Sequence, residues 1–184
     1  MKKYLFPSIK LTLVFLVICS ALYPLLIAGV GKLTPGHGNG ETVKVNGKVV
    51  GYSNIGQKFT DDKYFWGRPS AVDYNAAGSG GSNKGPSNPE YLKLVQDRID
   101  SFLVHNPGIN KNQIPAEMVT ASGSGLDPNI LPASAYIQIN RIAKVRHLAE
   151  EKIKSLIDQY IEKHFFGPTV VNVLKLNIAL DALK

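Results

Sequence analysis

Two stretches rich in glycine and serine carry the residue types that could do chemistry. The first is residues 67–90, "GRPSAVDYNAAGSGGSNKGPSNPE", which contains the glycines and the lysine that a phosphate-binding loop uses. Such a loop places its lysine directly after its second glycine, so that backbone amides and the ammonium converge on the phosphates. Here Lys84 precedes Gly85, so the order is wrong. We interpret the stretch as a structured surface loop rather than a phosphate site or a flexible linker, because aromatic residues precede it and a capped helix follows it.

The second stretch, "TASGSGL" at residues 120–126, resembles the turn that carries a serine nucleophile. That turn has the pattern Gly-x-Ser-x-Gly, and the stretch does not supply the first glycine of the pattern. Ser122 or Ser124 would be the nucleophile of an alternative function, a membrane-anchored extracytoplasmic serine hydrolase. The competing interpretation is a tight loop whose hydroxyls bind backbone groups.

Metal-binding and nucleic-acid-binding proteins are both disfavoured by the sequence. Asp61 and Asp62 alone do not make a cage for a cation, and the four histidines are scattered along the chain, at His37, His105, His147 and His164. The formal net charge is +7, but no run of four or more basic residues occurs. Phosphate backbones are recognised by clustered basic side chains, so neither a metal site nor a nucleic-acid partner is predicted.

Residues 11–31 form an uncharged, apolar run. As a helix, which rises about 1.5 Å per residue, this run would be about 31 Å long and would cross a hydrocarbon core of about 30 Å. A cleaved signal peptide with its cut near Cys19 is the alternative, but the apolar run continues well past the ~7–15 residues of a signal core. Pro24, in the middle of the run, suggests packing against other membrane helices. The single cysteine excludes an internal disulfide.

Charge on either side of the apolar run predicts its orientation. Lys2, Lys3 and Lys10 precede the run, whereas only Lys32 follows it closely. Excess positive charge favours the cytoplasmic side. We therefore predict a cytoplasmic N-terminus at residues 1–10, a transmembrane helix at 11–31, a linker at 32–41 and an extracytoplasmic domain at 42–184.

The domain after the linker is predicted to be helix-rich. Asn46-Gly47 between valine-rich runs predicts a hairpin over residues 42–52. Asn88 as N-cap and Pro89 at the first helical position predict a helix that ends near Asn106. Two further helices are expected, over about residues 132–147 and 149–164, followed by a short strand and a terminal helical turn or two. The fold class is α+β: one N-terminal transmembrane helix, then one helix-rich extracytoplasmic domain with a small β-hairpin or sheet. The aromatic residues of this domain that precede the first stretch are interpreted as core or, alternatively, as interface anchors: Phe59, Tyr64, Phe65 and Trp66.

Short segments along nearly the whole chain resemble those of one family. In order they are Tyr23-Pro24-Leu25, "IGQKF" (55–59), "YFWGRPSA" (64–71), "SGGSN" (79–83), "SNPE" (87–90), "VTASGSGLDP" (119–128), Gln138, Arg141 and "VVNVLKLNIALD" (170–181). Their order and spacing identify the chain as a member of the KdpC family, the C subunits of the Kdp potassium-transporting P-type ATPase.

The resemblance implies a non-catalytic accessory subunit of a bacterial inner-membrane pump that imports potassium with ATP. The subunit would be needed for the assembly, stability and activity of the pump. The implied partners are the potassium-channel-like KdpA, the P-type ATPase KdpB, the small KdpF and the membrane itself. The complex would use ATP and potassium, while this chain would bind no cofactor stably and would contribute no catalytic residue. Its domain would be periplasmic.

The family is described as a catalytic chaperone that raises the ATP affinity of KdpB. The loop suggested to contact ATP corresponds here to Ser79, Gly80, Gly81, Ser82 and Asn83. A periplasmic domain cannot meet cytoplasmic ATP, so this description conflicts with the predicted orientation, which we favour. The family's other suggested role, a cap over the outer ion entrance of KdpA that stabilises the complex, avoids the conflict.

Several residues are candidates for contacts with partners or for support of the domain. They are Tyr64, Phe65, Trp66, Gly67, Arg68, Pro69, Gln138, Arg141 and Pro24. We expect Arg68, Ser79 and Asn83 to hold the loop of residues 67–90 against the rest of the domain or against KdpA.

Overall fold

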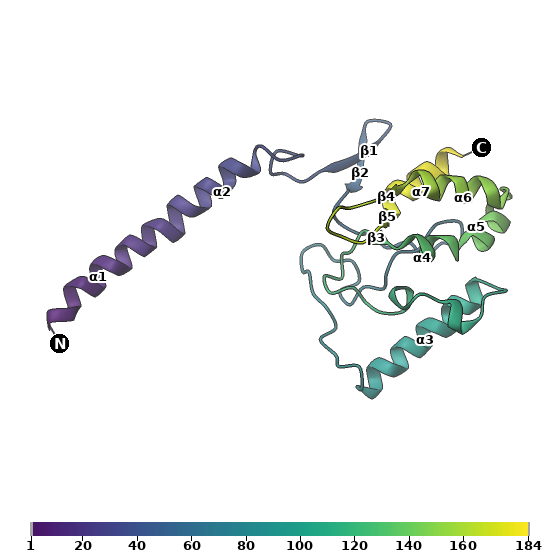
Figure 1. Cartoon of the computed structure of the whole chain (residues 1–184), viewed down its shortest axis with the longest axis horizontal. Helices are drawn as coiled ribbons and strands as arrows, with labels where there is room; N and C mark the ends of the chain where they lie inside the picture. The colour runs from purple at the N-terminus through teal and green to yellow at the C-terminus, as the bar shows by residue number, and fades with distance from the viewer. Residues whose placement is uncertain (1, 184) are drawn as a thin grey trace. The chain divides into compact units, whose positions relative to one another are not determined.

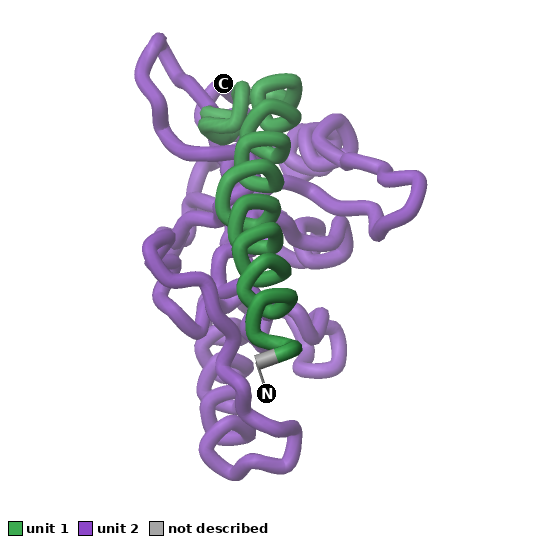
Figure 2. Tube along the Cα trace, turned by 90° about the vertical axis from the view of Figure 1, so that its left-hand side faces the viewer, with its two compact units in different colours: residues 1–42 green, residues 43–184 purple. Residues whose placement is uncertain are grey.

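The computed structural model describes residues 2–183 and contains two compact units. The boundary between the units lies between Thr42 and Val43 (Figure 2). We refer to the N-terminal part as unit 1 and to the C-terminal part as unit 2, and each is described by itself.

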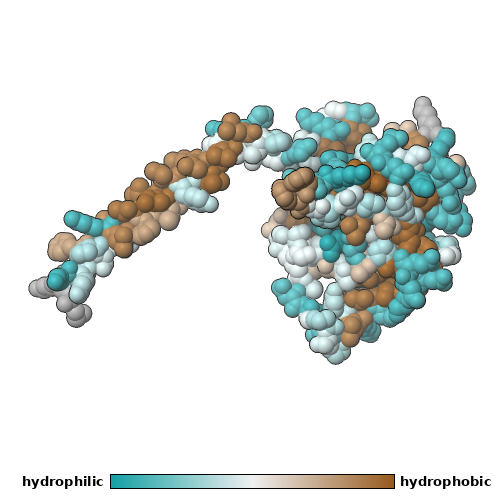
Figure 3. Space-filling view, in the orientation of Figure 1, coloured by the Kyte–Doolittle hydropathy of each residue, from teal (hydrophilic) through white to brown (hydrophobic). Residues whose placement is uncertain are grey.

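Unit 1 is a long helix made of α1 (Lys2–Val17), a π-helical turn η1 (Ile18–Leu22) and α2 (Tyr23–Gly31). Over Lys3–Gly31 it is long and apolar enough to cross a membrane, by length and composition. Its apolar side chains are exposed, as Figure 3 shows. The helix begins before residue 11, where the apolar run starts, and so includes the lysines that precede this run.

Pro24 explains the π-helical turn within this helix. Proline lacks an amide hydrogen and its ring clashes with the carbonyl one turn earlier. The chain accommodates this with a wider turn, in which the Tyr23 amide donates to the Ile18 carbonyl five residues back. Such local widening is a usual response to proline inside a helix.

The residues after the helix, 32–41, form consecutive turns. The His37 amide donates to the Thr34 carbonyl at 2.9 Å, and the Asn39 amide donates to the Gly36 carbonyl at 2.9 Å. Gly36 has a φ of 82°, and a Cβ there would collide with the Gly40 carbonyl. This glycine-rich segment is therefore shorter than an extended linker.

The predicted hairpin follows these turns, at the boundary between the two units, and the structure confirms it. Strands β1 (Thr42–Val45) and β2 (Lys48–Tyr52) form a two-stranded sheet. Asn46 and Gly47 have φ values of 49° and 78°, and positive φ at both central residues is the mark of a type I′ turn.

The first helix of unit 2, α3 (Pro89–His105), also has the predicted ends. The Asn88 side chain accepts a hydrogen bond from the Tyr91 amide at 3.0 Å, and Asn106 is the C-cap, directly before Pro107. Two short 3₁₀ turns follow, η2 (Lys111–Gln113) and η3 (Ala116–Met118).

The helix predicted over 132–147 is divided into α4 (Pro132–Tyr136) and α5 (Ile139–Arg146). The division falls at Gln138, which is fully buried. Its side-chain amide donates to the Ser134 carbonyl at 2.9 Å and bonds to the backbone of Trp66. Side chains that compete for backbone groups in this way interrupt helices.

The helix predicted over 149–164 ends early, as α6 (Glu150–Gln159), because the chain then enters a small sheet. In this sheet β4 (Ile161–Glu162) and β3 (Asn129–Ile130) pair antiparallel on either side of β5 (Val170–Asn172). The terminal helix α7 (Val173–Ala182) is longer than the turn or two expected, and the Asn172 side chain caps it by accepting from the Lys175 amide.

The core of unit 2 lies between this sheet and helices α4 to α7, which Figure 1 shows gathered around it. The fully buried apolar side chains include Phe65, Ile130, Ile142, Ile153, Ile157, Val171, Leu176 and Leu180. Phe65 comes from the long segment between β2 and α3, so that segment is fixed to the core. The structure therefore confirms an α+β fold with one apolar N-terminal helix.

Candidate functional site

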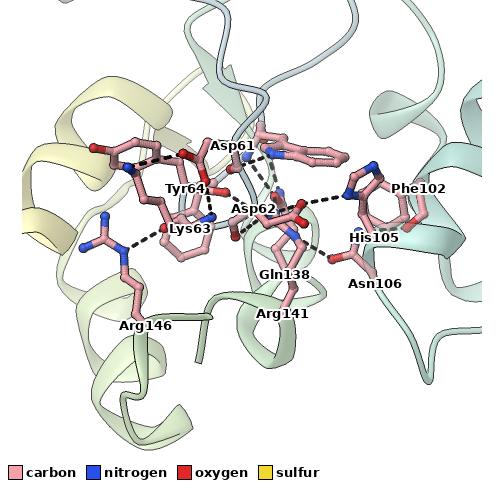
Figure 4. A network of polar contacts seen from close by, with 12 residues as sticks. Asp61, Asp62, Lys63, Tyr64, Phe102, His105, Asn106, Gln138, Arg141 and Arg146 are labelled. Carbon is pink, nitrogen blue, oxygen red and sulfur yellow. Dashed lines mark hydrogen bonds and ion pairs between the residues drawn. The ribbon is translucent and has the colours of Figure 1, made fainter. Parts of the chain in front are cut away.

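The buried guanidinium of Arg141, on α5, is the centre of a polar network (Figure 4). It donates to the Tyr64 carbonyl at 3.0 Å, the Asn106 Oδ1 at 3.1 Å and the Gln138 Oε1 at 2.6 Å, and also to the Asp62 carbonyl. Only 3% of Arg141 is exposed. One side chain thus joins α5 to the end of α3 and to the segment that begins at Asp62.

Burial lowers the pKa of Arg141 to about 10, and the Asp62 carboxylate partly opposes this. The guanidinium remains protonated at neutral pH. The nearest Asp62 carboxylate oxygen is 3.9 Å away, so most of the stabilisation comes from neutral acceptors and from the Trp66 ring, 4.5 Å from the guanidinium carbon. Such an arrangement holds a backbone in place and offers no free group for catalysis.

Two buried side-chain amides hold the backbone of Phe65 and Trp66. The Phe65 amide donates to the Asn177 Oδ1 at 2.8 Å, and the Asn177 Nδ2 donates back to the Phe65 carbonyl at 3.0 Å. The Trp66 amide donates to the Gln138 Oε1 at 2.8 Å, and the Gln138 Nε2 donates back to the Trp66 carbonyl at 3.2 Å. Each pair of hydrogen bonds satisfies backbone groups that a neighbouring strand would otherwise satisfy.

His105 and Asp62 form a pair at the edge of this network. The His105 Nδ1 lies 2.8 Å from the Asp62 Oδ1, and the imidazole packs edge-on against Trp66, with ring centroids 4.9 Å apart. Both side chains are partly exposed. Nothing in the sequence predicted this pair, because its members are 43 residues apart and each occurs in an ordinary surface context.

The loop of residues 79–83 lies against the second glycine-rich stretch. The Ser79 hydroxyl donates to the Ser124 carbonyl at 3.0 Å, and the Gly80 amide donates to the same carbonyl at 2.8 Å. The side chain of Asn83, which has a φ of 53°, has no hydrogen bond within the described part of the chain. The Ser79 hydroxyl and the Gly80 amide of this loop are therefore both bonded within the domain.

Gly125 permits this close approach. It has a φ of 67°, and a Cβ there would lie 2.8 Å from the Gly80 carbonyl oxygen and 2.6 Å from a methyl group of Val72. The Ser70 hydroxyl donates to the Gly125 carbonyl at 2.7 Å. Only glycine fits this position, and the two stretches seen in the sequence are in fact one packed layer.

Arg68 and Tyr74 also hold this layer in place. Arg68 pairs with Asp127 at 3.0 Å, and the Tyr74 hydroxyl donates to the Arg68 carbonyl. Burial, followed by the Asp127 charge, raises the pKa of Tyr74 to about 12. The phenol therefore stays protonated and can donate throughout the physiological range.

Ser122 and Ser124 have the roles of turn residues. Ser122 is buried, and its hydroxyl accepts from the Gly125 amide at 2.9 Å, while the Ser124 hydroxyl accepts from the Leu126 amide at 3.1 Å. Across residues 2–183, no described hydrogen bond joins either hydroxyl to a histidine. The same residues contain no cluster of three or more histidine, cysteine, aspartate or glutamate side chains that could hold a metal.

Comparison with known proteins gives the family. The KdpC family, described as the K+-transporting ATPase c chain, matches residues 5–182. A potassium-transporting ATPase KdpC subunit from Flavobacterium johnsoniae is 61% identical, over 99% of this chain and all of its own length. The subunits of the same name from Bacteroides thetaiotaomicron and Janthinobacterium are 53% and 47% identical, each over at least 98% of both chains. This chain belongs to the KdpC family.

The KdpC match covers both units and every residue proposed from the sequence. The structure brings Tyr64, Phe65, Trp66, Gln138 and Arg141 together in the Arg141 network. Gly67, Arg68 and Pro69 lead instead into the packed layer, where Arg68 pairs with Asp127 and the Pro69 carbonyl accepts from the Ser122 amide. Pro24 lies in unit 1. Asp62, His105, Asn106 and Asn177 belong to the same network. From the sequence, Asp62 and His105 were considered only as possible metal ligands, and neither Asn106 nor Asn177 was singled out as a site residue.

A cavity of about 510 Å³ lies beside the network in this KdpC-family domain, between α3 and residues 58–74. Trp66, Phe102 and His105 form part of its wall. Its charges are largely satisfied by the chain itself, since Lys58 pairs with Asp73 at 2.6 Å. Arg98 donates to the Val119 carbonyl, and burial lowers the pKa of Arg98.

Proposed function

We propose that this KdpC-family chain is the non-catalytic accessory subunit of a potassium-importing ATPase. Its domain would lie on the periplasmic side of the inner membrane and would support the assembly, stability and activity of the pump. The excess of lysines before the helix of unit 1 supports this orientation. The channel-like KdpA, the P-type ATPase KdpB and the small KdpF are the partners that we propose.

The packing of residues 79–83 against residues 122–125 is the observation that carries the non-catalytic role. A nucleotide-binding loop presents free amides and hydroxyls to phosphate oxygens. In this domain Ser79 and Gly80 both donate to the Ser124 carbonyl instead. We therefore propose that any effect of this subunit on the ATP affinity of KdpB passes through protein contacts, and that ATP and potassium are bound by other subunits.

An anchored serine hydrolase has no observation in its favour, because both candidate serines serve their own turns. A fluorophosphonate probe, which reacts with activated serines, is expected to leave the purified chain unlabelled. Labelling that disappears in Ser122→Ala or Ser124→Ala would support the hydrolase instead.

Growth at limiting potassium tests the proposed function. A strain that lacks this subunit should fail to grow when potassium is in the micromolar range, and the full chain supplied on a plasmid should restore growth. The purified chain alone should not be labelled by azido-ATP under ultraviolet light. Normal growth of the deletion strain would refute the accessory role. Specific labelling of the chain by azido-ATP would refute the proposal that ATP is bound only by other subunits.

A further inference from the structure

Phe165 and Phe166 are large apolar side chains that unit 2 leaves almost wholly in solvent. They are 93% and 96% exposed, and their rings pack edge to face with centroids 4.5 Å apart. They lie in the connection between β4 and β5, where Figure 3 shows an apolar knob on the surface. We propose that this pair inserts into the headgroup region of the membrane that the helix of unit 1 crosses.

The connection is held at its base by the three-stranded sheet. Ile161 pairs with Val171 and Glu162 with Val170, and Val171 is fully buried in the core. The Lys175 ammonium, at the start of α7, adds an ion pair to Glu162 at 3.1 Å. The two phenylalanines are therefore presented by a fixed base, so little of the strand framework has to be ordered when they bind.

The sheet also places the connection on the side of unit 2 where the chain enters. The Asn172 Nδ2, at the end of β5, donates to the Ser53 carbonyl at 2.8 Å, directly after the end of β2. The strand through which the chain arrives, β1, pairs with β2. Figure 1 shows the β4–β5 connection on the same side of unit 2 as the start of β1. Within unit 2, the exposed aromatic pair therefore lies on the side where β1 begins.

The short tether keeps unit 2 near the lipid. The helix ends at Gly31, and residues 32–41 would span at most about 36 Å if fully extended. The turns within that segment shorten it further. A domain of this size has a radius of gyration of only about 14 Å, so its surface on the tethered side lies within reach of the membrane.

The chemistry of the connection suits a lipid surface. Lys163 and His164 precede the phenylalanines and are also exposed. A cation beside aromatic side chains fits the boundary between anionic headgroups and acyl chains. The apolar helix of unit 1 also anchors the chain in a membrane, so lipid is an apolar surface available to the domain. The alternative is that the two phenylalanines bind in a pocket of a partner subunit, and the experiment distinguishes this pocket from the membrane.

Spin labelling of the full chain tests the proposal, since Cys19 is the only cysteine to remove. In a Cys19→Ser background, a nitroxide would be attached at Phe166→Cys and, as control, at Lys93→Cys on the exposed face of α3. The protein would be placed in vesicles of phosphatidylethanolamine and phosphatidylglycerol. The ratio of collision with oxygen to collision with a water-soluble nickel chelate should be several-fold higher at position 166 than at position 93. Equal ratios would overturn the proposal.

The label at position 166 replaces one of the two phenylalanines under test, so a second label is placed beside them. A nitroxide at Lys163→Cys should show the raised ratio with both phenylalanines present and should lose it in Phe165→Ser/Phe166→Ser. In the assembled pump, a label at position 166 that is shielded from both reagents would indicate a protein pocket and would also overturn the proposal. The inference needs the membrane span but not the side on which unit 2 lies, so it can fail or succeed independently of the proposed function.

Discussion

Arg141, Gln138 and Asn177 are polar side chains in the core whose hydrogen bonds hold an irregular segment. That segment, residues 62–66, has no strand partner, so its buried backbone groups would otherwise be unpaired. An unpaired buried polar group costs about 1–3 kcal/mol, which explains why long amide and guanidinium side chains occupy these core positions. Sequence reasoning named Gln138 and Arg141 through a resemblance, but their partners Trp66 and Tyr64 lie more than 70 residues away and could not be read from spacing.

Replacement of Arg141 should strongly destabilise unit 2. Arg141→Ala removes the donor to the Asn106 Oδ1 and to the Tyr64 carbonyl and opens a cavity beside Trp66. We expect a loss of at least about 3 kcal/mol in the free energy of unfolding. Urea unfolding of the full chain in detergent, followed by the fluorescence of its single tryptophan, would measure it.

Lys154→Ala is the control for this variant, because it removes an exposed cation on α6. Its unfolding free energy should stay within about 0.5 kcal/mol of that of the parent chain. Equal unfolding midpoints for Arg141→Ala and Lys154→Ala would contradict the role that we assign to Arg141.

Titration of Tyr74 should make the folded chain less stable at alkaline pH. Burial raises its pKa to about 12 in the folded chain, whereas an unfolded tyrosine titrates near pH 10. Between these values the unfolded state binds fewer protons, so stability is complete below pH 10 and falls as the pH rises toward 12. The loss in the free energy of unfolding over this range is about 3 kcal/mol, since one pKa unit corresponds to about 1.4 kcal/mol.

Tyr74→Phe removes this titration. The variant should be about 1 kcal/mol less stable at neutral pH, because it loses the hydrogen bond to the Arg68 carbonyl. Between pH 10 and 12 its unfolding free energy should fall less steeply than that of the parent chain. Parallel curves for the two proteins over this range would show that Tyr74 is not the group responsible.

At the scale of elements, the glycine-rich stretches and the short strands organise unit 2. The hairpin and α3 were predictable from the sequence because their turn and cap residues act locally, at Asn46-Gly47 and Asn88. The three-stranded sheet could not be predicted from the sequence, because strands of two or three residues are too short to show an alternating pattern. The division between α4 and α5 was missed for a related reason, because it depends on the contact of Gln138 with the distant Trp66.

Two glycines in one segment provide a matched test of the packed layer. Gly125→Ala places a Cβ against Val72 and the Gly80 carbonyl at a positive φ, so we expect a loss of about 2 kcal/mol in unfolding free energy. Gly123→Ala meets no atom within 4 Å and should be nearly neutral. Chemical unfolding of both variants measures this. Equal effects of the two substitutions would mean that the two stretches are not packed as described.

At the scale of the whole molecule, a KdpC-family chain combines an apolar helix with a domain whose polar groups are largely used to hold its own backbone. The family could be identified from the order of short segments in the sequence, and the comparison over residues 5–182 confirmed it. The role of the domain in the pump depends on which side of the membrane it occupies, and the excess of lysines before the helix predicts the periplasmic side.

Site-directed labelling of single cysteines tests this orientation most directly. In a Cys19→Ser background, Ser87→Cys would report on the exposed loop before α3 and Lys3→Cys on the N-terminal end of the helix. With a membrane-impermeant maleimide on intact spheroplasts, we expect Ser87→Cys to be labelled at once and Lys3→Cys only after permeabilisation. The reverse pattern would place the domain in the cytoplasm beside ATP and would contradict the proposed periplasmic, non-nucleotide role.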